Sequence, residues 1–185
     1  MAHGSGIAFA PGDGIAIASL SHGQMAVIAR HRAEILDRAA AHYPPDELLR
    51  RLGNYAALQR TWCLWGLMPG TVANEASPFN ICAHAYLAAT RDVLMRLQLL
   101  RPDDPGVVAL LHRIEAEMIG AGTALALCQY SADGFNTAVL IGPDWSQLPG
   151  HLPSLAALVL AAGLAAAALV ALLRPARVTG SARGR

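Results

Sequence analysis

Apolar side chains recur at helical spacing in four successive stretches of the chain. Each stretch begins at a residue that caps helix N-termini well, such as Ser21 with Gln24 three positions later, and ends at a proline or a polar turn. The pattern predicts four helices, which cover approximately residues 21–43, 46–68, 77–100 and 104–128.

The fourth stretch has the clearest pattern. Its apolar residues are spaced alternately four and three apart: Val107, Leu111, Ile114, Met118, Ala121, Leu125 and Cys128. This spacing is typical of the seam along which helices pack in a bundle. Since the connections between the predicted helices are mostly short, the sequence predicts a mainly α fold, an antiparallel four-helix bundle.

Two further segments have the features of strands. Residues 7–17 alternate apolar and small residues around the turn Pro11–Gly14, which predicts a small N-terminal β-hairpin, with a flexible arm as the alternative. Residues 137–141 are a strand candidate that could pair with it. The predicted organisation is a hairpin or arm (1–20), a helical bundle (21–131), a linker with a short strand (132–151), a transmembrane helix (152–173) and an arginine-rich tail (174–185).

The C-terminal apolar segment is the most specific signal in the chain. Residues 155–173 contain only Leu, Ala, Val and Gly. A helix of this length spans about 28 Å, close to the hydrocarbon thickness of a bilayer. The alternative, a buried helix of a soluble domain, is disfavoured because only the arginine-rich tail follows. Gly163 and Ala167, four residues apart, predict a face for packing against another membrane helix, including a second copy in a homo-oligomer.

Two sequence features disagree about the orientation in the membrane. Four arginines and no acidic residue follow the apolar segment, which favours a cytoplasmic tail by the positive-inside rule. The first thirty residues contain no segment of signal-peptide type, which favours a single-pass, tail-anchored protein with its domain in the cytoplasm. The second interpretation is the simpler one and predicts a cytoplasmic domain, while the opposite orientation stays open.

Composition narrows the function classes. The formal net charge is +1 and no basic stripe occurs, so no nucleic-acid partner is expected. All 14 basic residues are Arg, a bias typical of GC-rich bacterial genomes, and the absence of Lys excludes a Schiff-base lysine and a P-loop lysine. No motif combines a nucleophile with a base, so no catalytic residue is assigned and an enzyme is not the first expectation.

The three cysteines are Cys63, Cys82 and Cys128, and all stand in apolar helical context. Because their number is odd and no C-x-x-C pair occurs, reduced and buried thiols are expected rather than a disulfide framework.

Two short segments, His31 to Glu34 and His112 to Glu115, repeat the pattern His-Arg-x-Glu, and His84 on the third helix could join them. Helical bundles hold two irons through inward-facing carboxylates and histidines, so these five residues form a candidate iron or manganese site. The order is the reverse of the Glu-x-x-His motif of such sites, and solvated helix faces explain the same residues. No cofactor is therefore the first expectation.

The segment from Trp62 to Tyr86 has the most unusual composition, with two Trp, two Cys and a long connection between helices. Long loops often carry function. We expect a partner-binding surface formed by these residues: Trp62, Trp65, Glu75, Phe79, Asn80 and His84. The alternative is that they pack in the core and cap the third helix.

Together these features predict a membrane-anchored accessory or adaptor protein whose bundle binds a partner protein at a membrane complex. One alternative is a small metal-dependent, di-iron-like redox enzyme. Another is a sensor in which the thiol of Cys63 or Cys82 reports the redox state.

Overall fold

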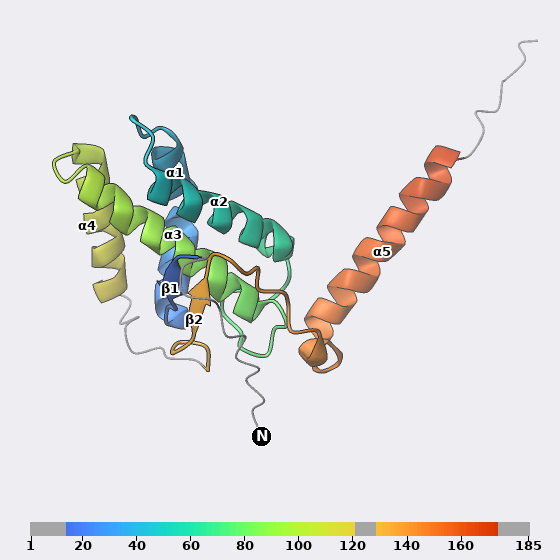
Figure 1. Cartoon of the computed structure of the whole chain (residues 1–185). Helices are drawn as coiled ribbons and strands as arrows, with labels where there is room; N and C mark the ends of the chain where they lie inside the picture. Colours follow the sequence, from blue (N-terminus) through green and yellow to red (C-terminus); the bar gives the residue numbers. More distant parts are fainter. Residues whose placement is uncertain (1–13, 121–128, 174–185) are drawn as a thin grey trace, which may run out of the picture.

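The computed structural model describes residues 14–120 and 129–173, and these are mainly helical (Figure 1). The elements in chain order are β1 (Ala16–Ala18), α1 (His22–Ala40), α2 (Glu47–Trp62), η1 (Leu64–Gly66), α3 (Asn80–Leu100), α4 (Pro105–Gly120), β2 (Gly134–Asn136), η3 (Trp145–Gly150) and α5 (Leu152–Leu173). The prediction of a mainly α fold with one C-terminal apolar helix is confirmed.

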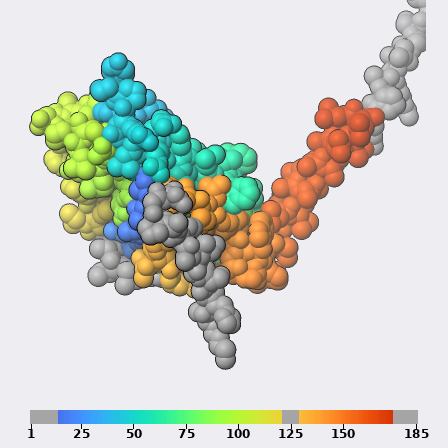
Figure 2. Space-filling model, in the orientation of Figure 1, coloured from blue at the N-terminus to red at the C-terminus, as the bar shows by residue number. Residues whose placement is uncertain are grey.

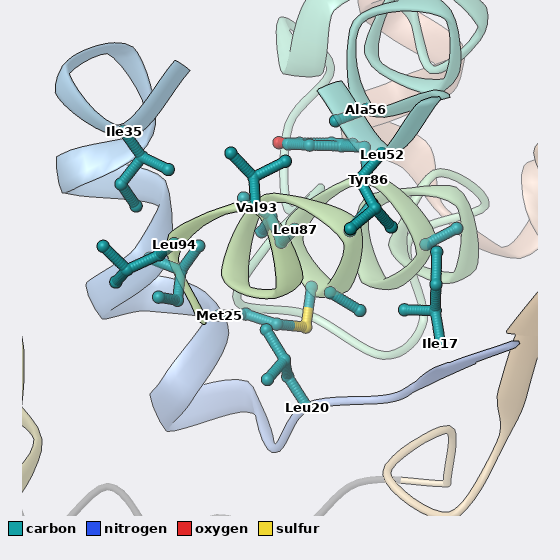
Figure 3. Packing of buried hydrophobic residues seen from close by; sticks show 14 of the residues in the cluster. Ile17, Leu20, Met25, Ile35, Leu52, Ala56, Tyr86, Leu87, Val93 and Leu94 are labelled. Atoms are coloured by element: carbon teal, nitrogen blue, oxygen red, sulfur yellow. The ribbon is translucent and has the colours of Figure 1, made fainter. Parts of the chain in front are cut away.

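The helix α3 lies at the centre of the domain. Its apolar and small residues face several directions, and 13 of its 21 residues are buried. α1 and α2 both pack along it, and α4 packs mainly on α1. Figure 3 shows side chains of α1, among them Met25, and of α2, among them Leu52, converging on α3 from different sides. A helix that is apolar on most of its surface must be covered in this way.

The predicted antiparallel four-helix bundle is not confirmed. In such a bundle each helix takes one corner around a shared core. Here α3 takes the centre, α1 contacts each of the other three helices, and α4 packs chiefly on α1. The seam of α4 still faces the core in its described part, because Val107, Leu111 and Ile114 are buried. The last three residues of the predicted seam, Ala121, Leu125 and Cys128, lie outside the described residues.

Three of the predicted helix starts are confirmed by their caps, at Ser21, Asp46 and Asp104. The Ser21 hydroxyl accepts a hydrogen bond from the amide of Gln24, and the Gln24 side chain accepts one from the amide of Ser21. At α4, one carboxylate oxygen of Asp104 accepts from the amides of Gly106 and Val107. These caps satisfy backbone donors that a helix start otherwise leaves unpaired.

Within the described residues, the second half of the predicted hairpin pairs with a strand far away in the sequence. β1 forms a two-stranded antiparallel sheet with β2, and Ile17 lies opposite Phe135 in the register. Both side chains are buried against the domain, which explains why these two short strands lie together. The strand expected at residues 137–141 is therefore found slightly earlier in the chain, and residues 1–13, with the other half of the predicted hairpin, lie outside the described residues.

The helix α5 leaves the domain as a separate rod (Figure 1). It is 22 residues long, and none of its apolar 18-residue window is buried. Its length and composition are sufficient to cross a membrane. The sequence left open a helix buried in the core of a soluble domain. The structure contradicts this alternative, because α5 is not buried.

We expect Ile28→Ala to lower the free energy of unfolding by roughly 2–5 kcal/mol, because a fully buried aliphatic side chain would leave a cavity. Ile28 is 0% exposed in α1, whereas Leu99 of α3 is 73% exposed. The matched control Leu99→Ala should change the free energy by no more than about 0.5 kcal/mol. Urea unfolding of the full chain in mild detergent, followed by circular dichroism, measures both values. Equal effects would contradict the packing described here.

Asp46 joins the start of α2 to α3. Its Oδ1 accepts a hydrogen bond from the amide of Leu49 at 2.8 Å, and Arg96 of α3 donates to both carboxylate oxygens at 3.0 and 2.7 Å. The Arg96 hydrogen bond first, and the Leu49 amide second, lower the pKa of Asp46 to about 2.

The variant Asp46→Asn tests this charge pair, since it keeps an oxygen for the helix cap and removes only the charge. Because the pKa of Asp46 is depressed in the folded protein, its charge stabilises the fold above about pH 4, and this contribution is lost as the pH falls toward 2. The free energy of unfolding of the wild type should therefore fall more steeply between pH 4 and pH 2 than that of Asp46→Asn. Asp103→Asn, at an exposed turn, serves as the control and should follow the wild type.

Candidate functional site at the base of α5

A disulfide between Cys63 and Cys82 ties the end of α2 to the first turn of α3. The two residues are 19 apart in sequence, their Cα atoms lie 5.7 Å apart, and both side chains are 0% exposed. The prediction that these two cysteines are reduced thiols is therefore wrong. It followed from the number and spacing of the cysteines, which do not reveal that α2 and α3 run side by side and bring these two together.

The chain turns sharply after this disulfide. Leu64, Trp65 and Gly66 of η1 have φ values of 50°, 55° and 66°, in the left-handed region that only glycine enters freely. A Cβ on Gly66 would lie 3.1 Å from the hydroxyl of Tyr86, so a side chain has little room there. Two strained non-glycine residues in succession persist only where the surroundings hold them, and such positions cluster at functional sites.

Large apolar side chains at the end of α2, in and after η1, and at the start of η3 are in contact with solvent. Trp62 is 56% exposed, Trp65 51% and Leu67 79%. Trp145, which packs edge to face on the buried Phe79, is 54% exposed. We call these four residues, Trp62, Trp65, Leu67 and Trp145, the aromatic surface. Figure 2 shows the end of α2 beside the segment that precedes α5, on the side of the domain from which α5 leaves.

The loop between η1 and α3 is held by internal hydrogen bonds. The buried Asn80 amide donates to the backbone carbonyls of Thr71 and Val72 at 3.2 and 3.5 Å, and the Ser77 hydroxyl donates to the carbonyl of Pro69. Asn80 therefore satisfies loop carbonyls that would otherwise be buried without partners.

The same loop holds the first turn of α5. The His151 ring forms hydrogen bonds with the side chain of Asn74 at 3.2 Å and with the hydroxyl of Ser154 at 2.8 Å, and both His151 and Ser154 are buried. Ser154 also donates to the carbonyl of Pro69. A further backbone bond, from the amide of Asp144 to the carbonyl of Pro78, ties down the preceding segment. The aromatic surface is thus connected to α5 by fixed contacts.

The structure divides the six residues predicted to bind a partner. Trp62 and Trp65 are exposed and Glu75 is half-buried, whereas Phe79, Asn80 and His84 are each 0% exposed. The sequence pattern did not distinguish the exposed residues from the buried ones. That difference arises because the chain before the loop lies at the surface of the domain, whereas the start of α3 lies in its core. Leu67, His151 and Ser154 stand in no motif, so no local sequence signal indicates their part in the site.

His84 lies within a group of polar residues under β1. Its Nδ1 is 3.0 Å from the hydroxyl of Ser19, and its ring lies 5.5 Å from that of His22 and 5.7 Å from that of Tyr130. Burial first, and the neighbouring His22 second, lower the pKa of His84 to about 4, so its ring is neutral at pH 7. This neutral, hydrogen-bonded histidine belongs to the core.

The residues predicted to hold iron or manganese are not brought together. Within the ranges 14–120 and 129–173, no group of three or more His, Cys, Asp or Glu side chains could hold a metal ion. His31 pairs with Glu117 at 2.8 Å, and Glu34 pairs with Arg38 and Arg113. His112 and Glu115 of α4 are exposed, and His84 lies in the core. The predicted repeat therefore lies mostly on ion-paired and solvated helix faces.

Comparisons of this chain with protein-family models, with curated proteins and with solved structures found no match.

Replacing Cys63 and Cys82 together by Ser should lower the free energy of unfolding by roughly 3 kcal/mol, because the cross-link restricts the unfolded chain. Urea unfolding of the full chain in mild detergent, without reductant, measures this loss. Adding reductant to the wild type should produce the same loss, and Cys128→Ser, which leaves the pair intact, is the control. A double variant as stable as the wild type would contradict a stabilising cross-link.

Proposed function

We propose that this protein is a non-catalytic accessory protein held on a membrane by α5, and that its domain binds a partner protein beside that anchor. The observation that supports this most directly is the aromatic surface at the base of α5. Large apolar side chains on the surface of a domain are normally dispersed, and a group of them next to a potential anchor marks a contact site.

The residue types of the aromatic surface favour recognition of a protein. Tryptophan is enriched among the residues that contribute most to protein–protein binding, because its large ring buries much area with few rotatable bonds. Trp62 is the last residue of α2 and Trp65 lies in the turn beyond it, and the disulfide of the buried Cys63 between them ties this part of the chain to α3. A surface fixed in this way loses little conformational entropy when it binds.

The place of the surface favours a membrane protein as the partner. The hydrogen bonds among Asn74, His151 and Ser154 keep α5 and the loop together. When α5 spans a bilayer, Trp65 and Leu67 are therefore held near the level at which the helix enters it. A membrane complex presents protein surface at that level, so an anchored accessory protein can reach it without a long linker. Gly163 and Ala167 of α5 are available for contacts within the bilayer.

A photoreactive phenylalanine analogue at position 65 of the full chain, in living cells, tests the partner. We expect one discrete protein adduct after illumination, and none from the same analogue at Leu99, which is more exposed than Trp65 but lies at the far end of α3. Trp62→Ala should weaken the affinity for the identified partner by roughly 30-fold, the loss typical of a residue at the centre of an interface.

Two outcomes would contradict the proposed partner. An adduct with lipid and no protein would mean that the aromatic surface lies in the headgroup region of the bilayer. Identical protein adducts from positions 65 and 99 would mean that the contacts are non-specific.

A further inference from the structure

We infer that the domain lies in an oxidising, extracytoplasmic compartment, that the arginine-rich tail lies in the cytoplasm, and that Cys63 and Cys82 are oxidised there by a thiol-oxidising protein. This inference rests on the membrane anchor of the proposed function and not on the partner. It extends that function, because it defines the side of the membrane on which a partner must present its contact surface.

The disulfide is the first observation. Stable disulfides form and persist in oxidising compartments, whereas the cytoplasm keeps thiols reduced. Disulfides of cytoplasmic proteins are usually catalytic or redox-sensing, and those roles need accessible sulfur atoms. Cys63 and Cys82 are both fully buried under the turn that carries Trp65, so their disulfide has the features of a structural cross-link.

The distribution of charge about α5 is the second and independent observation. After Leu173 the chain carries Arg174, Arg177, Arg183 and Arg185 and no acidic residue. Between Arg113 and α5 it carries no Lys or Arg at all. Basic residues close to a membrane span stay preferentially in the cytoplasm. This asymmetry places the tail in the cytoplasm and therefore the domain on the opposite side.

These two observations reverse the orientation that the sequence alone favours. That prediction gave more weight to the lack of a signal-peptide segment in the first thirty residues than to the positive-inside rule. It also treated the cysteines as reduced. Once Cys63 and Cys82 are paired, the cysteine chemistry and the charge distribution agree with each other.

The formation of the disulfide is a two-electron oxidation. The thiolate of one cysteine attacks an exchangeable disulfide of the thiol-oxidising protein, which forms a mixed disulfide and releases one thiolate of the oxidant. The second cysteine then attacks its partner's sulfur in the mixed disulfide, which forms the Cys63–Cys82 bond and releases the other thiolate of the oxidant. Two electrons pass to the oxidant, and the two cysteine protons pass to the solvent.

Accessibility of single cysteines in the membrane-inserted full chain tests the orientation. In a Cys128→Ser background, Asp103→Cys places a thiol at an exposed turn, at the end of α3 opposite to Cys82, and Ser181→Cys places one in the tail. Intact spheroplasts of a bacterial host are treated with a membrane-impermeant, polymer-linked maleimide. We expect Asp103→Cys to be labelled at once and Ser181→Cys only after the membrane is permeabilised. The reverse pattern, or protection of both sites, would overturn the inference.

The redox state of the pair is measured in the same cells. Free thiols are blocked on lysis, the protein is then reduced in denaturant, and the released thiols are counted by a polymer-linked maleimide. We expect two adducts per chain in the Cys128→Ser background and none when Cys63 and Cys82 are also replaced by Ser. A pair that is already blocked, and so yields no adduct, would overturn the inference even if the domain lies outside.

The two proposals fail separately. A reversed labelling pattern would leave the photochemical adduct at position 65 unchanged, and the absence of a protein adduct would leave the labelling pattern and the thiol count unchanged.

Discussion

The burial of α3 is the constraint on which the rest of the domain depends. Most of its surface is apolar or small, so it cannot lie on an outer corner and must be covered by its neighbours. The other helices of the domain therefore pack around α3. Both ends of α3 are also bonded to α2. Arg96 pairs with Asp46 near one end, and Cys82 is bonded to Cys63 at the other. The core thereby determines where α2 ends and where the loop to α3 must run.

The surface at the base of α5 follows from that arrangement. Beyond Cys63, which is bonded to α3, the chain passes through the left-handed turn of η1, and Trp65 and Leu67 lie in solvent there. The loop then folds back and contributes Asn74 to the hydrogen bonds around His151. A packed core, a cross-link and a polar network thus hold the exposed aromatic residues and the start of α5 in one fixed arrangement, and the proposal of binding beside a membrane rests on it.

Several parts of this protein were determined by the sequence alone, because they depend on residues close together in the chain. The capping box at Ser21, the cap at Asp104 and the long apolar run of α5 are local patterns, and each led to a correct element. The end of α2 was placed too late, since Trp62 is followed by residues that are apolar enough to continue a helix. The helix ends instead at Trp62, where Cys63 is cross-linked to α3 and the next residue, Leu64, has a positive φ.

The tertiary structure alone decided which distant residues meet. In the sequence, Cys63 and Cys82 have the features of ordinary core cysteines, and they form a disulfide because α2 and α3 lie side by side. The strand β1 pairs with β2, which is more than a hundred residues away in the sequence. The same holds for exposure: Trp62 and Phe79 are both large aromatic residues near the loop, yet one is in solvent and the other is fully buried. Burial and pairing depend on contacts between residues that are far apart in the sequence. A local sequence pattern therefore cannot predict them.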